Sequence, residues 1–163
     1  MHAAFPYIRL MAHMNAVELN APEARGKAGS IGHRVPRILL ADDQEEVRRT
    51  IVSMLEDEFE VEGSAENGSQ VLELAIKRPP DVLVLDICMP VLNGIETAAC
   101  LKAAGCPAKV LFVTVHEDPD FLNTAMSVGA LGYVSKAHLA TDLIPAIRSV
   151  MEGCVFISPC IHS

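Results

Sequence analysis

Short runs of apolar residues recur at regular intervals along residues 37–163. Three of them are continuous and cover residues 38–41, 82–85 and 110–113. Residues 59–62 alternate with polar positions, and residues 131–135 are predicted as a further strand. Between these runs, apolar side chains recur every three or four residues, as they do on the buried face of a helix. Strands that alternate with helices predict a parallel sheet with helices on both faces.

Each interval between strands carries the signals of a helix. Asn67-Gly68 and Asp118-Pro119 are typical helix starts, because Asn and Asp cap free backbone N–H groups and proline fits the first helical turn. The predicted helices cover residues 44–57, 67–78, 95–104, 120–128 and 141–151. Pro145 falls in about the first turn of the last helix, where proline is tolerated.

Right-handed crossovers leave few topologies for five strand–helix units, and the flavodoxin-like strand order 2-1-3-4-5 is the leading one. We therefore predict a doubly wound α/β fold over residues 37–157. Residues 1–36 lack a sustained hydrophobic period and predict a flexible N-terminal tail. Residues 158–163 are expected to form a C-terminal tail or the start of a truncated linker.

Charge is distributed unevenly along the chain. Residues 1–36 carry a net charge of +2, and residues 37–163 carry a net charge of −10. Such an acidic body repels phosphate backbones, which argues against direct nucleic-acid binding by this chain. No apolar run approaches the ~20 residues of a membrane span and no secretion signal is visible, so we expect a cytoplasmic protein without a membrane partner.

The five cysteines include no C-x-x-C pair. An odd number without metal-ligand spacing, in a chain not predicted to be secreted, indicates reduced thiols, most of them small side chains of the core. Cys160, near the end of the chain, is expected to be an exposed thiol instead. The spacing also argues against a zinc site.

Polar side chains stand where four of the predicted strands end. Asp42 and Asp43 follow the first strand, Asp86 follows the third, Thr114 ends the fourth and Lys136 follows the fifth. These strands are adjacent in the predicted order. We therefore expect the five residues to converge at the carboxyl edge of the sheet, where open α/β sheets bind their ligands.

Three carboxylates in one crevice repel each other unless a cation neutralises them. Mg²⁺ characteristically takes carboxylates, waters and phosphoryl oxygens as ligands. A threonine hydroxyl and a lysine ammonium both suit phosphoryl oxygens. The combination predicts transfer of a phosphoryl group onto the carboxylate of Asp86, with Mg²⁺ and Lys136 stabilising the charge.

Four sequence segments carry a resemblance to a known family. They are residues 38–43 with Asp42-Asp43, Asp86-Ile87-Cys88-Met89-Pro90 with Gly94, Val113-Thr114, and Gly132-Tyr133-Val134-Ser135-Lys136. Together they resemble the receiver domain of two-component response regulators, over residues 37–157. The resemblance implies that Asp86 is the phosphoacceptor and that Asp42, Asp43, Asp86 and the backbone carbonyl of Cys88 bind Mg²⁺. It also implies that Thr114 contacts the phosphoryl group and that Tyr133 is an aromatic switch.

Residues 129–136 and 153–159 further resemble receivers of the NarL/FixJ class, in which a DNA-binding helix-turn-helix domain usually follows. Because none is visible before Ser163, we expect a single-domain regulator or a truncated transcription factor. The resemblance implies a histidine kinase or phosphotransfer protein as partner, is compatible with a homodimer, and implies no turnover of an external substrate. Cys88 and His116 are expected to tune the lifetime of the phosphoaspartate.

Two other functions are alternatives. A haloacid-dehalogenase-like phosphatase also uses an aspartate at a strand end as its nucleophile, but it needs a second aspartate two residues later, where this sequence has Cys88. A vestigial receiver would act as an interaction module that needs no phosphorylation, and the complete set of site residues argues against it. The main prediction is a receiver that is read out on its fourth helix, fifth strand and fifth helix.

Overall fold

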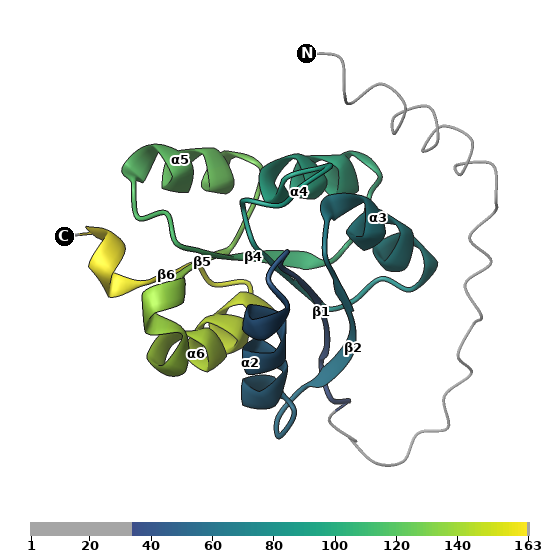
Figure 1. Cartoon of the computed structure of the whole chain (residues 1–163), viewed down its shortest axis with the longest axis horizontal. Coiled ribbons are helices and arrows are strands. Elements are labelled where there is room, and N and C mark those ends of the chain that lie inside the picture. The colour runs from purple at the N-terminus through teal and green to yellow at the C-terminus, as the bar shows by residue number, and fades with distance from the viewer. Residues whose placement is uncertain (1–33, 163) are drawn as a thin grey trace. The chain divides into compact units, whose positions relative to one another are not determined.

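The computed structural model describes residues 34–162, and its centre is a parallel β-sheet (Figure 1). The strands in this part of the chain are β1 (Arg37–Ala41), β2 (Glu60–Ala65), β3 (Val82–Leu85), β4 (Lys109–Thr114), β5 (Gly132–Ser135) and β6 (Phe156–Ile157). They lie in the order β2-β1-β3-β4-β5-β6, and neighbouring strands are parallel. The predicted order 2-1-3-4-5 is confirmed, with a short strand added at the edge.

Helices cover both faces of this sheet. They are α2 (Glu45–Leu55), α3 (Gly68–Lys77), α4 (Gly94–Ala103), α5 (Pro119–Ser127) and α6 (Leu139–Met151), with short 3-10 helices η1 (Lys136–His138) and η2 (Pro159–His162). In Figure 1, α3, α4 and α5 lie on one face and α2 and α6 on the other. This is the doubly wound, flavodoxin-like arrangement that the alternation of the sequence predicts.

Polar side chains fix the starts of three helices. The side chain of Asn67 accepts a hydrogen bond from the backbone N–H of Gln70, and that of Asp118 accepts one from Asp120 ahead of α5. At α4, Asn93 and Glu96 form a capping box in which each side chain binds the other's backbone N–H. These bonds satisfy donors that a helix leaves free at its N-terminus, so the predicted starts at 67 and 118 are confirmed.

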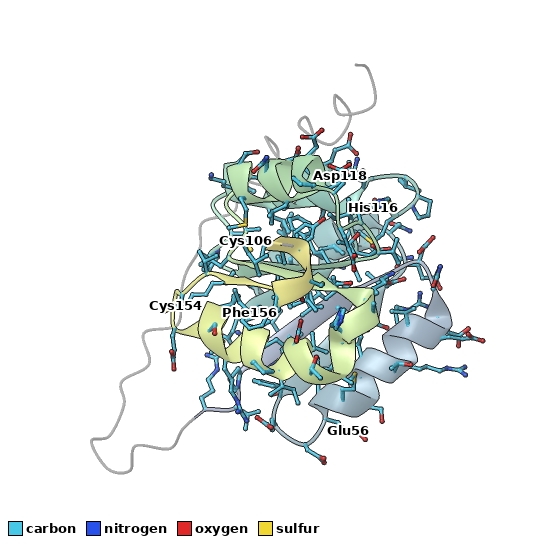
Figure 2. All side chains as sticks on the ribbon, turned by 90° about the vertical axis from the view of Figure 1, so that its left-hand side faces the viewer. Glu56, Cys106, His116, Asp118, Cys154 and Phe156 are labelled. Atoms are coloured by element: carbon cyan, nitrogen blue, oxygen red, sulfur yellow. The ribbon has the colours of Figure 1, made fainter. Side chains whose placement is uncertain are left out.

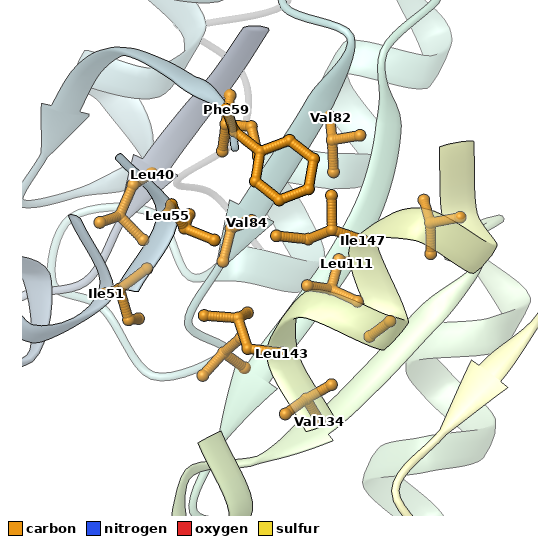
Figure 3. Close-up of a cluster of buried hydrophobic side chains, with 14 residues drawn as sticks. Leu40, Ile51, Leu55, Phe59, Val82, Val84, Leu111, Val134, Leu143 and Ile147 are labelled. Carbon is orange, nitrogen blue, oxygen red and sulfur yellow. The ribbon is translucent and has the colours of Figure 1, made fainter. Parts of the chain in front are cut away.

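Apolar side chains, among them the ring of Phe59, fill the layer between the sheet and helices α2 and α6 (Figure 3). Ile51 and Leu55 of α2 and Leu143 and Ile147 of α6 are fully buried in a cluster that includes Val84 of β3. Burying one such side chain stabilises the fold by about 1.5–3 kcal/mol. The layer therefore holds α6, and with it the turn that leaves β5, in a fixed position.

Helix α6 differs from the prediction. It begins at Leu139 rather than residue 141, so Pro145 lies in the helix interior and not in its first turn. Pro145 is exposed, and water can reach the carbonyl oxygen that the proline leaves without a helical donor. The cost of an interior proline is also offset by the buried apolar face of the helix.

Residues at the two ends of the chain bear on the predicted boundaries. The tail predicted for residues 1–36 lies, up to residue 33, outside the described residues. At the other end, Ser158 and Ile161 are buried. The division into a domain of residues 37–157 and a C-terminal tail stays a prediction. Within residues 34–162, every helix falls short of the length and hydropathy that crossing a bilayer requires.

Candidate functional site

The parallel strands bring the predicted site residues to one edge of the sheet. Asp42 directly follows β1, Asp86 follows β3, Thr114 ends β4 and Lys136 follows β5. The last residues of β1 and β3 are paired in register, and the backbone N–H of Asp86 donates to the carbonyl of Ala41 at 2.8 Å. The two aspartates therefore leave the sheet side by side.

The three acidic residues form one cluster. Carboxylate oxygens of Asp42, Asp43 and Asp86 lie within 4.8 Å of one another. Asp42 and Asp86 are buried, whereas Asp43 is exposed at the rim. Backbone N–H groups orient the buried pair, with Gln44 donating to Asp42 at 2.9 Å and Cys88 donating to Asp86 at 3.4 Å.

Lys136 connects the two buried carboxylates. Its Nζ lies 2.6 Å from Oδ2 of Asp42 and 3.3 Å from Oδ2 of Asp86. Burial by itself would lower the pKa of Lys136, but the hydrogen bond to Asp42 and the charge of Asp86 outweigh it and raise that pKa above its usual value. The lysine therefore stays charged at neutral pH and holds one end of each aspartate.

One ammonium does not neutralise the cluster. Burial, and next the charge of Asp42, raise the pKa of Asp86, while Lys136 and the N–H of Cys88 lower it only in part. Negative charge is thus concentrated on oxygen atoms at the edge of the sheet. Hard oxygen donors with excess negative charge are the donor set that Mg²⁺ prefers, so the cluster fits this cation.

The hydroxyl groups of Thr114 and Tyr133 both contact the backbone of His116. The N–H of His116 donates to Oγ1 of Thr114 at 3.2 Å, and the hydroxyl of Tyr133 donates to the carbonyl of His116 at 2.9 Å. Tyr133 is fully buried, and burial, with the charge of Asp118, raises its pKa to about 12. The neutral phenol therefore links β5 to the loop that follows β4.

The structure brings Cys88 and His116 into direct contact, which the sequence did not predict. Sγ of Cys88 and Nε2 of His116 are 3.0 Å apart, although 28 residues separate them. The ring of His116 also stacks on Phe121 of α5, with centroids 4.2 Å apart. Burial, followed by the charges of Asp86 and Asp43, raises the pKa of the Cys88 thiol. The pair forms a border next to the acidic cluster.

Phe121 is a member of this border that the sequence analysis missed. It lies in the first turn of α5 and lines a shallow pocket together with Asp43 and Cys88. Nothing in the sequence distinguishes it from other apolar residues of an amphipathic helix. Its proximity to the site follows only from the packing of α5 beside the loop after β3.

Gly94 allows α4 to begin directly behind Asp86. A Cβ atom at this position would lie 2.0 Å from the backbone oxygen of Asp86, far inside van der Waals contact. The N–H of Gly94 also donates to the carbonyl of Ile87 at 2.9 Å. The glycine that the sequence analysis singled out thus supports the loop that carries Asp86 and Cys88.

The cysteines are free, as predicted, but their placement corrects the prediction that most lie in the core. None of the five is buried: Cys88 and Cys154 are exposed, and Cys100, Cys106 and Cys160 are partly exposed. In Figure 2, Cys106 and Cys154 lie toward one side of the molecule, away from the labelled His116. The interior positions are occupied by larger aliphatic side chains, which bury more apolar area.

Comparison with known proteins gives consistent matches. The family model described as the response regulator receiver domain matches residues 38–148. The transcriptional regulatory protein DegU of Brevibacillus brevis is 35% identical over 125 residues, which are 76% of this chain and 53% of that protein. Response regulator GacA of Pseudomonas aeruginosa is 37% identical over 125 residues, 76% of this chain and 58% of its own length. The chain thus spans slightly more than half of these curated relatives.

Solved structures agree with the sequence matches. The signal receiver domain of the putative response regulator NarL from Mycobacterium tuberculosis is 30% identical, with a TM-score of 0.70 over 74% of this chain and 98% of that one. A two-component response regulator of the LuxR family from an Aurantimonas species is 29% identical, with a TM-score of 0.75 over 79% of this chain and 94% of that one.

Proposed function

Because this chain belongs to the response regulator receiver domain family, we propose that Asp86 accepts a phosphoryl group from a histidine kinase or a phosphotransfer protein. Receivers are phosphoacceptors of two-component phosphorelays and not enzymes that turn over an external substrate. The observation that carries the assignment to Asp86 is the convergence of three carboxylates and Lys136 at one edge of the sheet.

In the proposed reaction, a carboxylate oxygen of Asp86 attacks the phosphorus of a phosphohistidine. The new P–O bond gives an acyl phosphate as the P–N bond breaks, and the leaving imidazole keeps the bonding electron pair and takes up a proton. Asp86 must be ionised to attack. Lys136, 3.3 Å from its Oδ2, favours the ionised carboxylate and can stabilise negative charge on the transferred group.

We assign Asp42, Asp43 and Asp86, with the backbone carbonyl of Cys88, as the groups that would hold Mg²⁺. When bound, the cation supplies positive charge that neutralises the carboxylates and the incoming phosphoryl oxygens. The excess negative charge of the cluster, expressed in the raised pKa of Asp86, supports this assignment. The N–H of Gln44 and the ammonium of Lys136 hold the two carboxylate oxygens of Asp42 in place beside those of Asp43 and Asp86.

Thr114 and Tyr133 are the proposed switch. Both contact the backbone of His116, so movement of the Thr114 hydroxyl toward a phosphoryl group would disturb the carbonyl to which Tyr133 donates. Phosphorylation would then shift a population between two pre-existing arrangements of the loop after β4. Cys88 and His116 border the acidic cluster and are proposed to tune phosphoaspartate lifetime by controlling the approach of water.

The proposed output is altered affinity for an effector, a partner or a second copy of this chain, through the surface of α5, β5 and α6. The relatives named above are a transcriptional regulatory protein and a response regulator. By analogy with them, we propose control of transcription as the output of this chain. We expect the chain to act in the cytoplasm, where a histidine kinase draws on ATP. We expect no direct contact between this chain and DNA, because the net charge of −10 on residues 37–163 repels the phosphate backbone.

The decisive experiment is intact-mass spectrometry after incubation with acetyl phosphate. We expect a gain of one phosphoryl group that requires Mg²⁺, is lost on addition of EDTA and is absent from Asp86→Asn. Asp57→Asn is the matched control, since Asp57 is an exposed carboxylate outside the site, and it should label like the wild type. Equal labelling of Asp86→Asn would refute the assignment. A folded wild-type chain that takes up no phosphoryl group would favour an interaction module independent of phosphorylation.

A further inference from the structure

A second group of metal-ligating side chains lies outside the acidic cluster. Glu117, in the loop between β4 and α5, His138, at the end of η1, and Cys160, in η2, each place one ligand atom within 4.8 Å of the others. The three residues come from segments that follow three neighbouring strands, β4, β5 and β6. Figure 2 faces this side of the molecule, with the sequence neighbours of Glu117, His116 and Asp118, labelled beside the C-terminal segment.

Few other groups compete for the ligand atoms of these three side chains. Oε1 of Glu117 accepts hydrogen bonds from Oγ of Ser135 at 2.7 Å and from Sγ of Cys160 at 3.8 Å. Among residues 34–162, Glu117 forms no ion pair with a lysine or an arginine. In the same part of the chain, the ring of His138 forms no hydrogen bond. Ser135 and Cys160 therefore orient the carboxylate, and the thiol already points at one of the two other ligand atoms, while the imidazole keeps both ring nitrogens unpaired among residues 34–162.

The chemistry of the three atoms differs from that of the acidic cluster. One carboxylate oxygen, one imidazole nitrogen and one thiol sulfur form the mixed set that Zn²⁺ prefers, whereas Mg²⁺ prefers oxygen alone. We propose that Glu117, His138 and Cys160 form a binding site for Zn²⁺ or a similar transition-metal ion, with water as the fourth ligand. On binding, Cys160 releases its proton to solvent, and the thiolate and the carboxylate together balance the charge of the dication.

The geometry needs only a small contraction. Zinc–ligand bonds of about 2.0–2.3 Å place tetrahedral ligand atoms roughly 3.3–3.8 Å apart, so the side chains must approach by about 1 Å. Glu117 and His138 are exposed and Cys160 is partly exposed, and rotation of their side chains is therefore not blocked by close packing. The carboxylate of Asp142, which accepts a hydrogen bond from Ser158 at 2.6 Å, adds negative charge nearby.

A bound ion would join the C-terminal 3-10 helix to the loop that follows β4. This loop also carries His116, whose carbonyl accepts the hydrogen bond of Tyr133. His138 is two residues from Lys136 in the same short helix. Occupancy would therefore stabilise both segments against local opening and would brace the loop beside the phosphoacceptor site. The three side chains already lie together in the unphosphorylated chain, so metal binding does not require phosphorylation.

The test uses the reduced, metal-free full chain in excess Mg²⁺, which occupies the acidic cluster, and titrates it with Co²⁺ as a spectroscopic substitute for Zn²⁺. We expect one equivalent of Co²⁺ to produce a thiolate-to-metal charge-transfer absorption that Zn²⁺ then abolishes by displacement. Cys160→Ser should remove this absorption. His138→Ala should weaken Co²⁺ and Zn²⁺ binding by at least ~10-fold, the loss that even indirect contacts to a metal cause.

Two cysteine variants serve as controls. Cys88→Ser removes the thiol beside the acidic cluster, Cys154→Ser removes an exposed thiol elsewhere, and both should retain the absorption. Absence of any charge-transfer absorption in the wild type would overturn the proposal. So would an absorption that survives Cys160→Ser, or one that Cys88→Ser abolishes. If Cys160→Ser disturbs folding, His138→Ala still tests the site. The His138 side chain makes no cap hydrogen bond to α6, so its removal should leave the helix intact.

Discussion

At the scale of single residues, the site depends on the balance of charge around Asp86. Burial and the neighbouring Asp42 disfavour its ionised form, and the ammonium of Lys136 compensates for this in part. The side chain is therefore poised to gain stabilisation from a cation. The burial and the neighbouring charge that prepare Asp86 to bind a cation are also what makes its ionised form unfavourable in the metal-free fold.

The first prediction concerns the stability of the metal-free protein. The pKa of Asp86 is raised in the folded state, so the folded protein holds this proton more tightly than the unfolded chain. Its contribution to stability should therefore decrease as pH rises from 3.8, the ordinary pKa of an aspartate, through the raised pKa of the folded state. Asp86→Asn removes the charge, and in EDTA at neutral pH we expect it to stabilise the protein by about 1 kcal/mol, as relief of an unfavourable charge commonly does.

Thermal unfolding of both proteins in EDTA, from acidic to neutral pH, checks this prediction. The advantage of Asp86→Asn should grow as pH rises through the titration of Asp86. Lys136 keeps its partner in the variant, because Asp42 remains 2.6 Å away. A variant that is less stable than the wild type at neutral pH would contradict the proposed balance of charge.

At the scale of elements, backbone contacts at the carboxyl edge set the position of the acidic loop. Helix α4 begins at Gly94 directly against the backbone of Asp86, and Asn93 caps it. Because the contact is between main chains, no side-chain rotation can relieve a clash. The start of α4 and the loop after β3 therefore behave as one unit.

The second prediction follows from this contact. Gly94→Ala would place Cβ 2.0 Å from the carbonyl oxygen of Asp86, and we expect a loss of about 2–3 kcal/mol in the free energy of unfolding. Gly105→Ala is the matched control: it has a φ of +74°, but no atom lies within 4 Å of a Cβ there. The control should lose about 1 kcal/mol, the cost of the left-handed conformation alone.

Urea denaturation of the two glycine variants measures the difference. Gly94→Ala should also accept a phosphoryl group more slowly, because the loop of Asp86 must shift to relieve the clash. Equal losses of stability in both variants would indicate that close approach at Gly94 does not matter.

At the scale of the whole molecule, the parallel sheet collects negative charge from distant parts of the sequence at one edge. Asp42 and Asp86 come from strands 44 positions apart, yet their strands are neighbours. A cation bound there therefore connects segments that are separate in the unfolded chain. Binding to the folded state alone stabilises the whole domain.

The third prediction is a Mg²⁺-dependent increase in Tm. At a concentration 100 times its dissociation constant, Mg²⁺ should add about 2.7 kcal/mol, or several degrees in Tm. Asp43→Asn should reduce this shift without harming the metal-free fold, because Asp43 is exposed at the rim. Asp57→Asn should leave the shift intact. If Asp43→Asn responds to Mg²⁺ as the wild type does, Asp43 is not a ligand.

The sequence predicted which strands and helices exist better than it predicted the residues at which they begin and end. The apolar runs located β1, β3, β4 and β5, and capping residues fixed the starts of α3 and α5. Helix α6 extended past its apparent start, β2 continued to residue 65 beyond the alternation at 59–62, and β6 was missed. These ends are set by packing against the sheet and by pairing at its edge, which leave no periodic signal in a few residues.

The sequence by itself determined the acidic cluster, because parallel strands with right-handed crossovers must bring their carboxyl ends to one edge, whatever the side chains between them. Only the tertiary structure decided which loop residues meet beyond that edge. The contact of Cys88 with His116 and the group of Glu117, His138 and Cys160 join segments that have no fixed spacing in the chain. Their distances depend on how each loop turns and packs after its strand, and no local pattern encodes this.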